Sequence, residues 1–176
     1  MPAGVAHTVA SLGNDQQTVV LTAFPSEEIS RTLVPDEYVF KDRKDLLPGP
    51  DDPESLMRFK LADEYELYPK VRFRDLFAQR SGSAGICGGY ARIEPGYSIP
   101  CHTVPYDETS TIVEGQAIYI VAGNKYSLRE YSTAFVPRGM PRQLVNEGNK
   151  TVELIWVYAG KDPERSVLDP QFCTGK

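Results

Sequence analysis

Metal-binding and nucleophilic side chains are few in this 176-residue chain. It contains two histidines, His7 and His102, and three cysteines, Cys87, Cys101 and Cys173. The cysteines form no CxxC pair and no zinc-type cluster. Their odd number, in a chain without a recognisable secretory signal, predicts free thiols that are mostly buried. A site with several imidazoles would have to recruit His7, and residues this close to a terminus are usually mobile.

Cys101 and His102 have the side-chain types of a nucleophile and its base. They are adjacent in sequence, however, and adjacent residues on a strand point to opposite faces. If His102 points into a barrel, Cys101 points out of it. We therefore expect no Cys–His catalytic pair at this position.

The composition indicates a globular, acidic protein. Apolar residues make up 41% of the chain and charged residues 24%, with a net charge of −5 and a pI near 5.1. A nucleic-acid-binding surface needs clustered Lys and Arg, so this charge argues against one. No stretch approaches the roughly 20 apolar residues of a membrane helix, and the N-terminus lacks the basic and apolar regions of a secretory signal. We therefore expect a cytoplasmic protein that binds neither nucleic acid nor membrane.

The pattern of the sequence changes near residue 70. Residues 1–69 are rich in proline and acidic residues and are expected to form an N-terminal arm. Within this arm, the apolar run at 19–24 predicts a strand, and the Pro- and Gly-containing stretch 45–52 predicts a turn or linker. A short helix is expected at 53–59, because proline is favourable in a first helical turn.

Residues 70–160 are expected to form the main domain, and 161–176 an extended tail that docks onto another surface. Short β-rich runs about ten residues apart, separated by Gly- or Asn-containing turns, are typical of a sandwich or barrel. No helical period interrupts them, which argues against a parallel α/β sheet. The predicted strands are 70–77, 84–93, 98–104, 110–113, 116–121, 125–128, 132–136, 142–145 and 152–158.

Two motifs in this region resemble those of the cupin superfamily. The stretch 96–115, GYSIPCHTVPYDETSTIVEG, resembles the first cupin motif, G(X)5HXH(X)3-4E(X)6G, with His102 and Glu108 in register. The stretch 137–146, PRGMPRQLVN, resembles the second, PXG(X)2H(X)3N, with its Pro, Gly and Asn in place. The resemblance implies an all-β, RmlC-like cupin fold, a double-stranded β-helix barrel or jelly roll, carrying an N-terminal arm.

The departures from these motifs fall on the metal ligands. Cupins that bind a metal use two His and the Glu of the first motif and the His of the second. Here Val104 stands at the second His position and Arg142 at the His position of the second motif. Tyr131 also replaces the glycine that usually opens the second motif. Only His102 and Glu108 remain of the four ligands that the resemblance implies.

Ligand chemistry supports the same expectation. Catalytic transition-metal sites usually need three protein ligands. Val104 has no lone pair, and the guanidinium of Arg142 stays protonated, so a fixed positive charge stands where a cation would bind. The sequence therefore predicts that this chain has no metal centre and no cofactor of its own.

The remaining polar residues have two interpretations. Arg142 and Glu108 face the same barrel interior by motif position, so an ion pair with His102 nearby is the simpler expectation, since a buried charge needs a partner. Alternatively, Arg142 holds a small anionic ligand and His102 acts as an acid or base. His102, Glu108 and Arg142 are therefore the candidate catalytic residues.

A closer resemblance concerns size, the altered motifs and the stretch 156–165, WVYAGKDPER. Together these are similar to the small subunit of two-subunit hydroquinone 1,2-dioxygenases. That resemblance implies a larger cupin subunit that holds Fe(II) and cleaves a small aromatic substrate. It also implies that this chain supports the assembly, with N-terminal residues that could cover the mouth of the partner's active site.

Two other functions remain open on the sequence. One is a stand-alone, metal-independent isomerase, lyase or cyclase that acts on a small anionic substrate. The other is a non-catalytic barrel that binds a small molecule. Either would be compatible with a homodimer, because open barrels of this type commonly pair.

Overall fold

The structure is a computed structural model that describes residues 7, 9, 17–26, 28, 30–35, 55–83 and 85–174. The chain forms two compact units, Met1–Leu56 and Met57–Lys176, and each is described by itself. No described helix is long and apolar enough to cross a membrane.

The described part of the first unit contains no helix or strand. The strand predicted at 19–24 is therefore wrong: these residues are irregular, and Val19 and Leu21 are exposed. An apolar run becomes a strand only when a neighbouring strand pairs with it, and the described residues of this unit offer none. Local contacts include the guanidinium of Arg31, 5.8 Å from the ring centre of Phe24.

The predicted helix at 53–59 is wrong where the structure describes it, because residues 55–58 are irregular and a single 3-10 turn follows, η2 (Phe59–Leu61). Tertiary contacts fix this turn. The ring of Phe59 packs edge-on against Tyr90 with 4.8 Å between ring centres, and Arg74 Nη1 donates to the carbonyl of Ala62 at 2.6 Å. The predicted linker at 45–52 lies outside the described residues.

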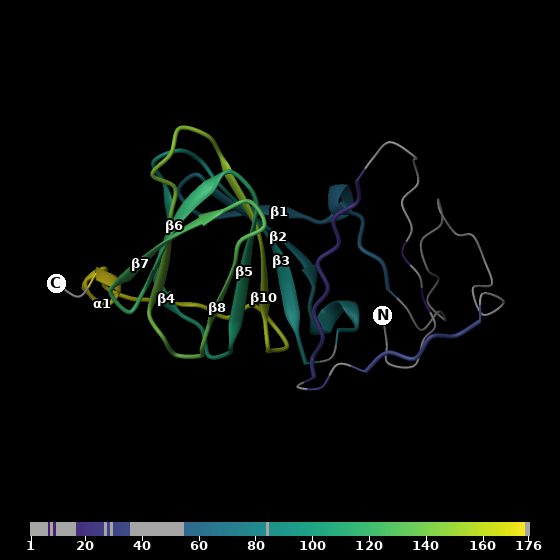
Figure 1. The fold of residues 1–176 in the computed structure, drawn as a ribbon. Coiled ribbons are helices and arrows are strands. Elements are labelled where there is room, and N and C mark those ends of the chain that lie inside the picture. The colour runs from purple at the N-terminus through teal and green to yellow at the C-terminus, as the bar shows by residue number, and fades with distance from the viewer. Residues whose placement is uncertain are drawn as a thin grey trace. The chain divides into compact units, whose positions relative to one another are not determined.

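The second unit consists of two antiparallel sheets that face each other (Figure 1). Sheet A has the order β1-β2-β3-β10-β5-β8, and sheet B has the order β11-β4-β9-β6-β7. The strands are β1 (Glu64–Tyr68), β2 (Val71–Phe77), β3 (Cys87–Ile93), β4 (Ser98–Thr103), β5 (Glu108–Glu114), β6 (Gln116–Val121), β7 (Asn124–Arg129), β8 (Thr133–Val136), β9 (Arg142–Val145), β10 (Val152–Tyr158) and β11 (Ser166–Val167). A second 3-10 turn, η3 (Gln79–Ser81), and a short helix, α1 (Gln171–Thr174), complete the described elements.

The predicted all-β fold is confirmed, and all nine predicted strands are present, three of them with the predicted bounds. Alternation of inward apolar and outward polar residues explains this success, because it is a local property of each strand. Two strands were missed. β1 lies inside the stretch assigned to the N-terminal arm, yet it pairs with β2, and Tyr65 stacks on Phe73 at 5.8 Å between ring centres. β11 has only two residues.

The hydrophobic core fills the space between the sheets. Its members come from both sheets, and the polar residues of the candidate site lie among them. The largest fully buried apolar side chains are Trp156, Tyr119, Tyr158, Phe73, Ile93, Ile112, Leu144 and Leu154. A second, smaller cluster of Cys101, Ile120 and Cys173 is formed where the C-terminal segment, residues 161–174, meets sheet B.

Gly115 and Tyr131 are two of the positions between strands that have positive φ. Gly115 joins β5 to β6 with φ of 84°, and a Cβ there would lie 2.7 Å from the carbonyl oxygen of Thr151. Tyr131 stands where cupin motifs usually have glycine, and it keeps the left-handed conformation with φ of 63°. A non-glycine residue in this region costs about 1 kcal/mol, and the Tyr131 side chain is exposed.

The cysteines differ from the expectation of three free thiols. Cys101 and Cys173 form a disulfide, and Cys87 is a buried free thiol. Burial raises the pKa of the Cys87 thiol to about 12. As expected from strand alternation, Cys101 and its neighbour His102 point to opposite sides of β4, and the outward side is the one that α1 covers. The pairing was missed because a separation of 72 residues leaves no local pattern in the sequence.

This disulfide is expected to contribute strongly to stability. A Cys173→Ser variant loses a cross-link that closes a loop of more than 70 residues, which in the chain-entropy account is worth about 4 kcal/mol. We expect the midpoint of urea unfolding to fall in this variant, and in the wild type under a reductant, by the same amount. A reductant effect that persists in Cys173→Ser would contradict the assignment.

Candidate functional site

The carboxylate of Glu108 joins the two sheets inside the barrel. Glu108 lies at the start of β5 in sheet A and is buried. Its Oε2 accepts a hydrogen bond from Arg142 Nη1 of β9 in sheet B at 2.8 Å. Its Oε1 accepts from Ser110 Oγ at 2.8 Å and from Tyr119 Oη of β6 at 3.3 Å. Two residues of sheet B therefore bind one carboxylate of sheet A.

Arg142 is completely buried, with 0% of its surface exposed. Besides Glu108, it donates from Nε to the carbonyl of Met140 at 3.0 Å and from Nη2 to the carbonyl of Pro137 at 2.8 Å. All three guanidinium nitrogens are thus engaged by the protein itself. This arrangement corresponds to the ion pair expected from the sequence, and it argues against Arg142 as a holder of an external anion.

His102 is the cross-strand neighbour of Arg142 on β4 and is buried. Its Nδ1 lies 2.8 Å from the carbonyl of Pro100, and because a carbonyl can only accept, Nδ1 carries the proton and Nε2 the lone pair of the neutral ring. Burial is the main cause that lowers the pKa of His102, and the positive charges of Arg165 and Arg142 lower it further, while the charge of Glu108 opposes them.

The residues at the cupin ligand positions do not fit a metal ion. Val104 is fully buried in the apolar core and has no donor atom. Arg142 brings a permanent positive charge to the second position, and Glu108 already neutralises it. Within the described ranges, no group of three or more His, Cys, Asp or Glu side chains is placed to hold a metal. His7 belongs to the first unit, so the structure does not place it relative to this site.

The interior cavity at this site is very small. Its volume is about 10 Å³, which is at the lower limit for one water molecule. The side chains that line it combine polar and aromatic groups from both sheets. They are Ile99, His102, Glu108, Ser110, Tyr119, Leu144, Leu154, Trp156, Tyr158 and Arg165.

Arg165 is a charged residue of the cavity wall to which sequence reasoning gave no role. It follows β10 in the C-terminal segment, and its Cζ lies 4.7 Å from the ring centre of Trp156, 4.8 Å from Phe73 and 5.2 Å from Tyr158. Burial raises the pKa of Tyr158 well above its usual value, and the charge of Glu108 raises it further. No local motif marks Arg165, because its partners come from β2 and β10.

Removal of the Glu108 charge is expected to destabilise the fold. In a Glu108→Gln variant, Arg142 becomes a buried charge without a counter-charge, which costs roughly 3 kcal/mol or more. The double variant Glu108→Gln/Arg142→Met keeps acceptors for Ser110 and Tyr119 without leaving a charge, so it is expected to be more stable than Glu108→Gln alone. Urea unfolding measures both variants.

Glu114→Gln is the matched control for that series, because Glu114 is an exposed carboxylate on the same strand. It is expected to change the free energy of unfolding by less than about 0.5 kcal/mol. Equal losses in Glu108→Gln and Glu114→Gln would contradict the bridging role of Glu108.

The lowered pKa of His102 predicts a stability change in acid. Because the folded pKa lies below the ordinary value of 6.5, the unfolded chain takes up the proton first as the pH falls. The contribution is therefore fully present above about pH 6.5 and is lost progressively below it, down to the folded pKa. Urea unfolding between about pH 5 and about pH 8 is expected to show a shallower loss for His102→Gln than for wild type. Identical curves for His102→Gln and the wild type would refute the effect.

Comparisons with known proteins agree with this architecture. Residues 89–158 match the family model described as Cupin domain. The polyketide cyclase RemF from Streptomyces resistomycificus has a similar structure, with 17% identity and a TM-score of 0.57 over 69% of this chain and 90% of that chain. No curated protein matches the chain.

Two further solved structures are similar. An RmlC-like cupin from Shewanella frigidimarina is 17% identical, with a TM-score of 0.55 over 63% of this chain and 94% of that chain. A variant of the oxalate decarboxylase OxdC from Bacillus subtilis is 17% identical, with a TM-score of 0.61 over 71% of this chain and 36% of that chain. Identities this low establish the fold alone. Residues 89–158 therefore resemble a cupin domain, and the two sheets form an all-β jelly roll of the cupin type.

Proposed function

We propose that this chain is a cupin subunit without a metal centre of its own, which supports a larger catalytic cupin subunit. The observation that carries the proposal is the buried pair of Arg142 and Glu108, 2.8 Å apart. The guanidinium stands at a ligand position of the cupin motif. It pairs with Glu108, the one carboxylate at another ligand position, so that this carboxylate is no longer free to bind a metal. Metal chemistry in the assembly then has to come from a second chain.

The small volume of the interior also supports a substrate site on the partner chain. An aromatic ring the size of benzene fits a cavity of about 150 Å³, whereas the interior cavity here has about 10 Å³. A small aromatic substrate therefore binds at the partner rather than inside this barrel. The barrel's polar residues serve to hold its two sheets together.

The outer surface offers a place for a partner. Tyr131 and Phe135 are 64% and 63% exposed, and Val113 is also exposed. All three lie near the β5–β8 edge of sheet A: Phe135 is on β8, Val113 on β5, and Tyr131 N donates to the carbonyl of Ile112. Aromatic residues are enriched in protein interfaces. Among the strands that the structure describes, β8 pairs only with β5, so no described strand pairs with its other edge.

The kind of partner is inferred from a resemblance in the sequence. The stretch 156–165 and the chain length resemble the small subunit of hydroquinone 1,2-dioxygenases. On this basis the partner is an Fe(II)-dependent cupin that cleaves a hydroquinone-type ring. This chain then packs against the partner, and the residues of the partner bind the Fe(II).

The test is the metal content and mass of the chain purified natively from its source at low salt. We expect a complex with a larger cupin chain and about one iron per pair of chains, and we expect the iron to stay with the larger chain on separation. Stoichiometric metal on the isolated chain would overturn the proposal. A metal-free homodimer with its own turnover would support a stand-alone enzyme instead.

A surface variant sharpens this test. Phe135→Glu places a charge on the proposed contact surface and is expected to release the partner without unfolding the barrel. Tyr126→Glu is the matched control, because Tyr126 is an exposed aromatic residue on β7 of the other sheet. Equal retention of the partner by both variants would exclude the β5–β8 edge as the contact.

A further inference from the structure

The C-terminal segment, residues 161–174, runs from one sheet to the other and is attached along its length (Figure 1). It starts beside η3, where Gln79 N donates to the carbonyl of Lys161 at 2.9 Å. It then forms β11, which pairs with β4 next to His102. At its end, Cys173 is joined to Cys101 by the disulfide, and Gly123 N donates to the carbonyl of Cys173 at 2.9 Å.

Between these attachments, Arg165 extends into an aromatic cage formed by Phe73, Trp156 and Tyr158. Its Cζ lies between 4.7 and 5.2 Å from all three ring centres. The cage is closely built: Gly89 lies beside the indole, and a Cβ there would approach Trp156 Cζ2 to 2.6 Å. Ring faces carry negative potential and attract cations, planar guanidinium groups in particular.

Arg165 also contributes to the wall of the interior cavity. Its side chain lines that cavity together with Glu108, Trp156 and Tyr158. Glu108 forms its ion pair with Arg142, and Arg165 is held by the three ring faces together with favourable electrostatic interactions with Tyr158 and Glu108. Withdrawal of this one side chain would leave an aromatic, electronegative recess that opens toward the carboxylate of Glu108.

We propose that the cage of Phe73, Trp156 and Tyr158 is a binding site for a small planar cation of the guanidinium or amidinium class. In the disulfide-bonded chain, Arg165 occupies this site as an internal ligand. A free cation of the same shape and charge enters when the C-terminal segment withdraws. An anion is not accepted, because it would face the negative ring surfaces.

The disulfide determines how strongly Arg165 competes with a free cation for the aromatic cage. A tethered group has a high effective concentration at its site, of the order of millimolar or above for short connections. The Cys101–Cys173 bond closes the tether at its far end, so Arg165 is held between two fixed points. Without the bond, this part of the segment is held by non-covalent contacts such as the β11–β4 pairing and the hydrogen bond from Gly123 N to the Cys173 carbonyl, and Arg165 competes less well.

This inference does not rest on the proposed function, since its test uses the isolated chain and measures binding alone. Trp156 is the single tryptophan of the chain, so its fluorescence reports on the cage directly. The probe is methylguanidinium chloride at constant ionic strength, with methylurea as a neutral probe of the same shape. Both are titrated below denaturing concentrations.

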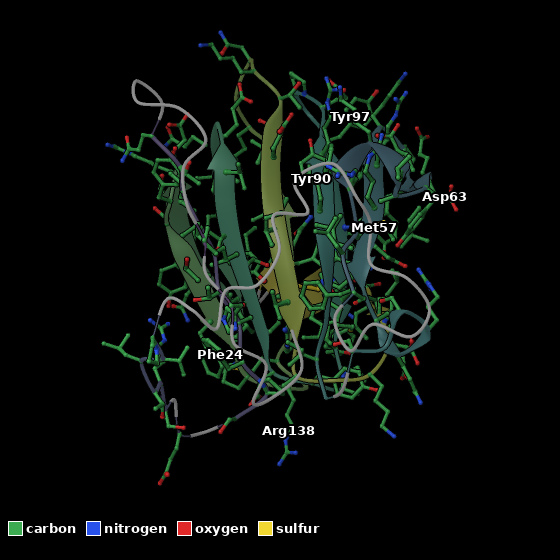
Figure 2. The ribbon with its side chains drawn as sticks, turned by 90° about the vertical axis from the view of Figure 1, so that its right-hand side faces the viewer. Phe24, Met57, Asp63, Tyr90, Tyr97 and Arg138 are labelled. Carbon is green, nitrogen blue, oxygen red and sulfur yellow. A yellow bond between two sulfur atoms is a disulfide. The ribbon has the colours of Figure 1, made fainter. Side chains whose placement is uncertain are left out.

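Arg165→Ala empties the cage while the disulfide stays intact. We expect a saturable fluorescence change with methylguanidinium in this variant, with an affinity at least about tenfold higher than in the oxidised wild type, and no saturable change with methylurea. Arg138→Ala is the matched control, because the Arg138 side chain extends from the barrel into solvent (Figure 2). It is expected to behave as the wild type.

Cys173→Ser is the second variant, and it keeps Arg165 in the chain. We expect its affinity for methylguanidinium to lie between those of the oxidised wild type and Arg165→Ala. A folded Arg165→Ala protein with no saturable response, or with equal responses to both probes, would overturn the proposal. If Arg165→Ala fails to fold, equal titrations of Cys173→Ser and oxidised wild type overturn it instead.

Discussion

The carboxylate of Glu108 is the interaction on which the interior of this barrel depends. It receives hydrogen bonds from Arg142 and Tyr119 of the opposite sheet and from Ser110 of its own strand. A charge taken out of water has to be compensated by a counter-charge and hydrogen bonds, and here one carboxylate and one guanidinium compensate each other. The two sheets are thereby held in a single relative arrangement around a polar centre.

The same pair occupies two of the positions at which cupin motifs place metal ligands. Cupin motifs place their ligands on strands that face each other across the barrel, and this geometry is kept at His102, Glu108 and Arg142. With a guanidinium in place of an imidazole, the facing positions attract each other directly. Val104 then becomes an ordinary core residue, and His102 is held neutral beside the pair.

The C-terminal segment completes the barrel from outside the cupin motifs. It adds β11 to sheet B, covers the outer side of β4 through α1, and inserts Arg165 between the sheets. Two guanidinium groups therefore lie in one interior and are stabilised in different ways. Arg142 is bound directly by a carboxylate and carbonyls, whereas the described contacts of Arg165 are with ring faces, supported by the nearby charge of Glu108.

The sequence alone determined the all-β architecture and the nine main strands, because alternation and turns are local properties of the chain. It also placed Arg142 and Glu108 in one interior, since both motif positions point inward. Tertiary structure decided the rest: the Cys101–Cys173 bond, the pairing of β1, the irregular backbone at 19–24 and the insertion of Arg165. The first, second and fourth of these depend on contacts with residues distant in sequence, and the irregular backbone at 19–24 reflects the lack of a pairing strand among the described residues of its unit. Distant contacts leave no pattern in the local sequence.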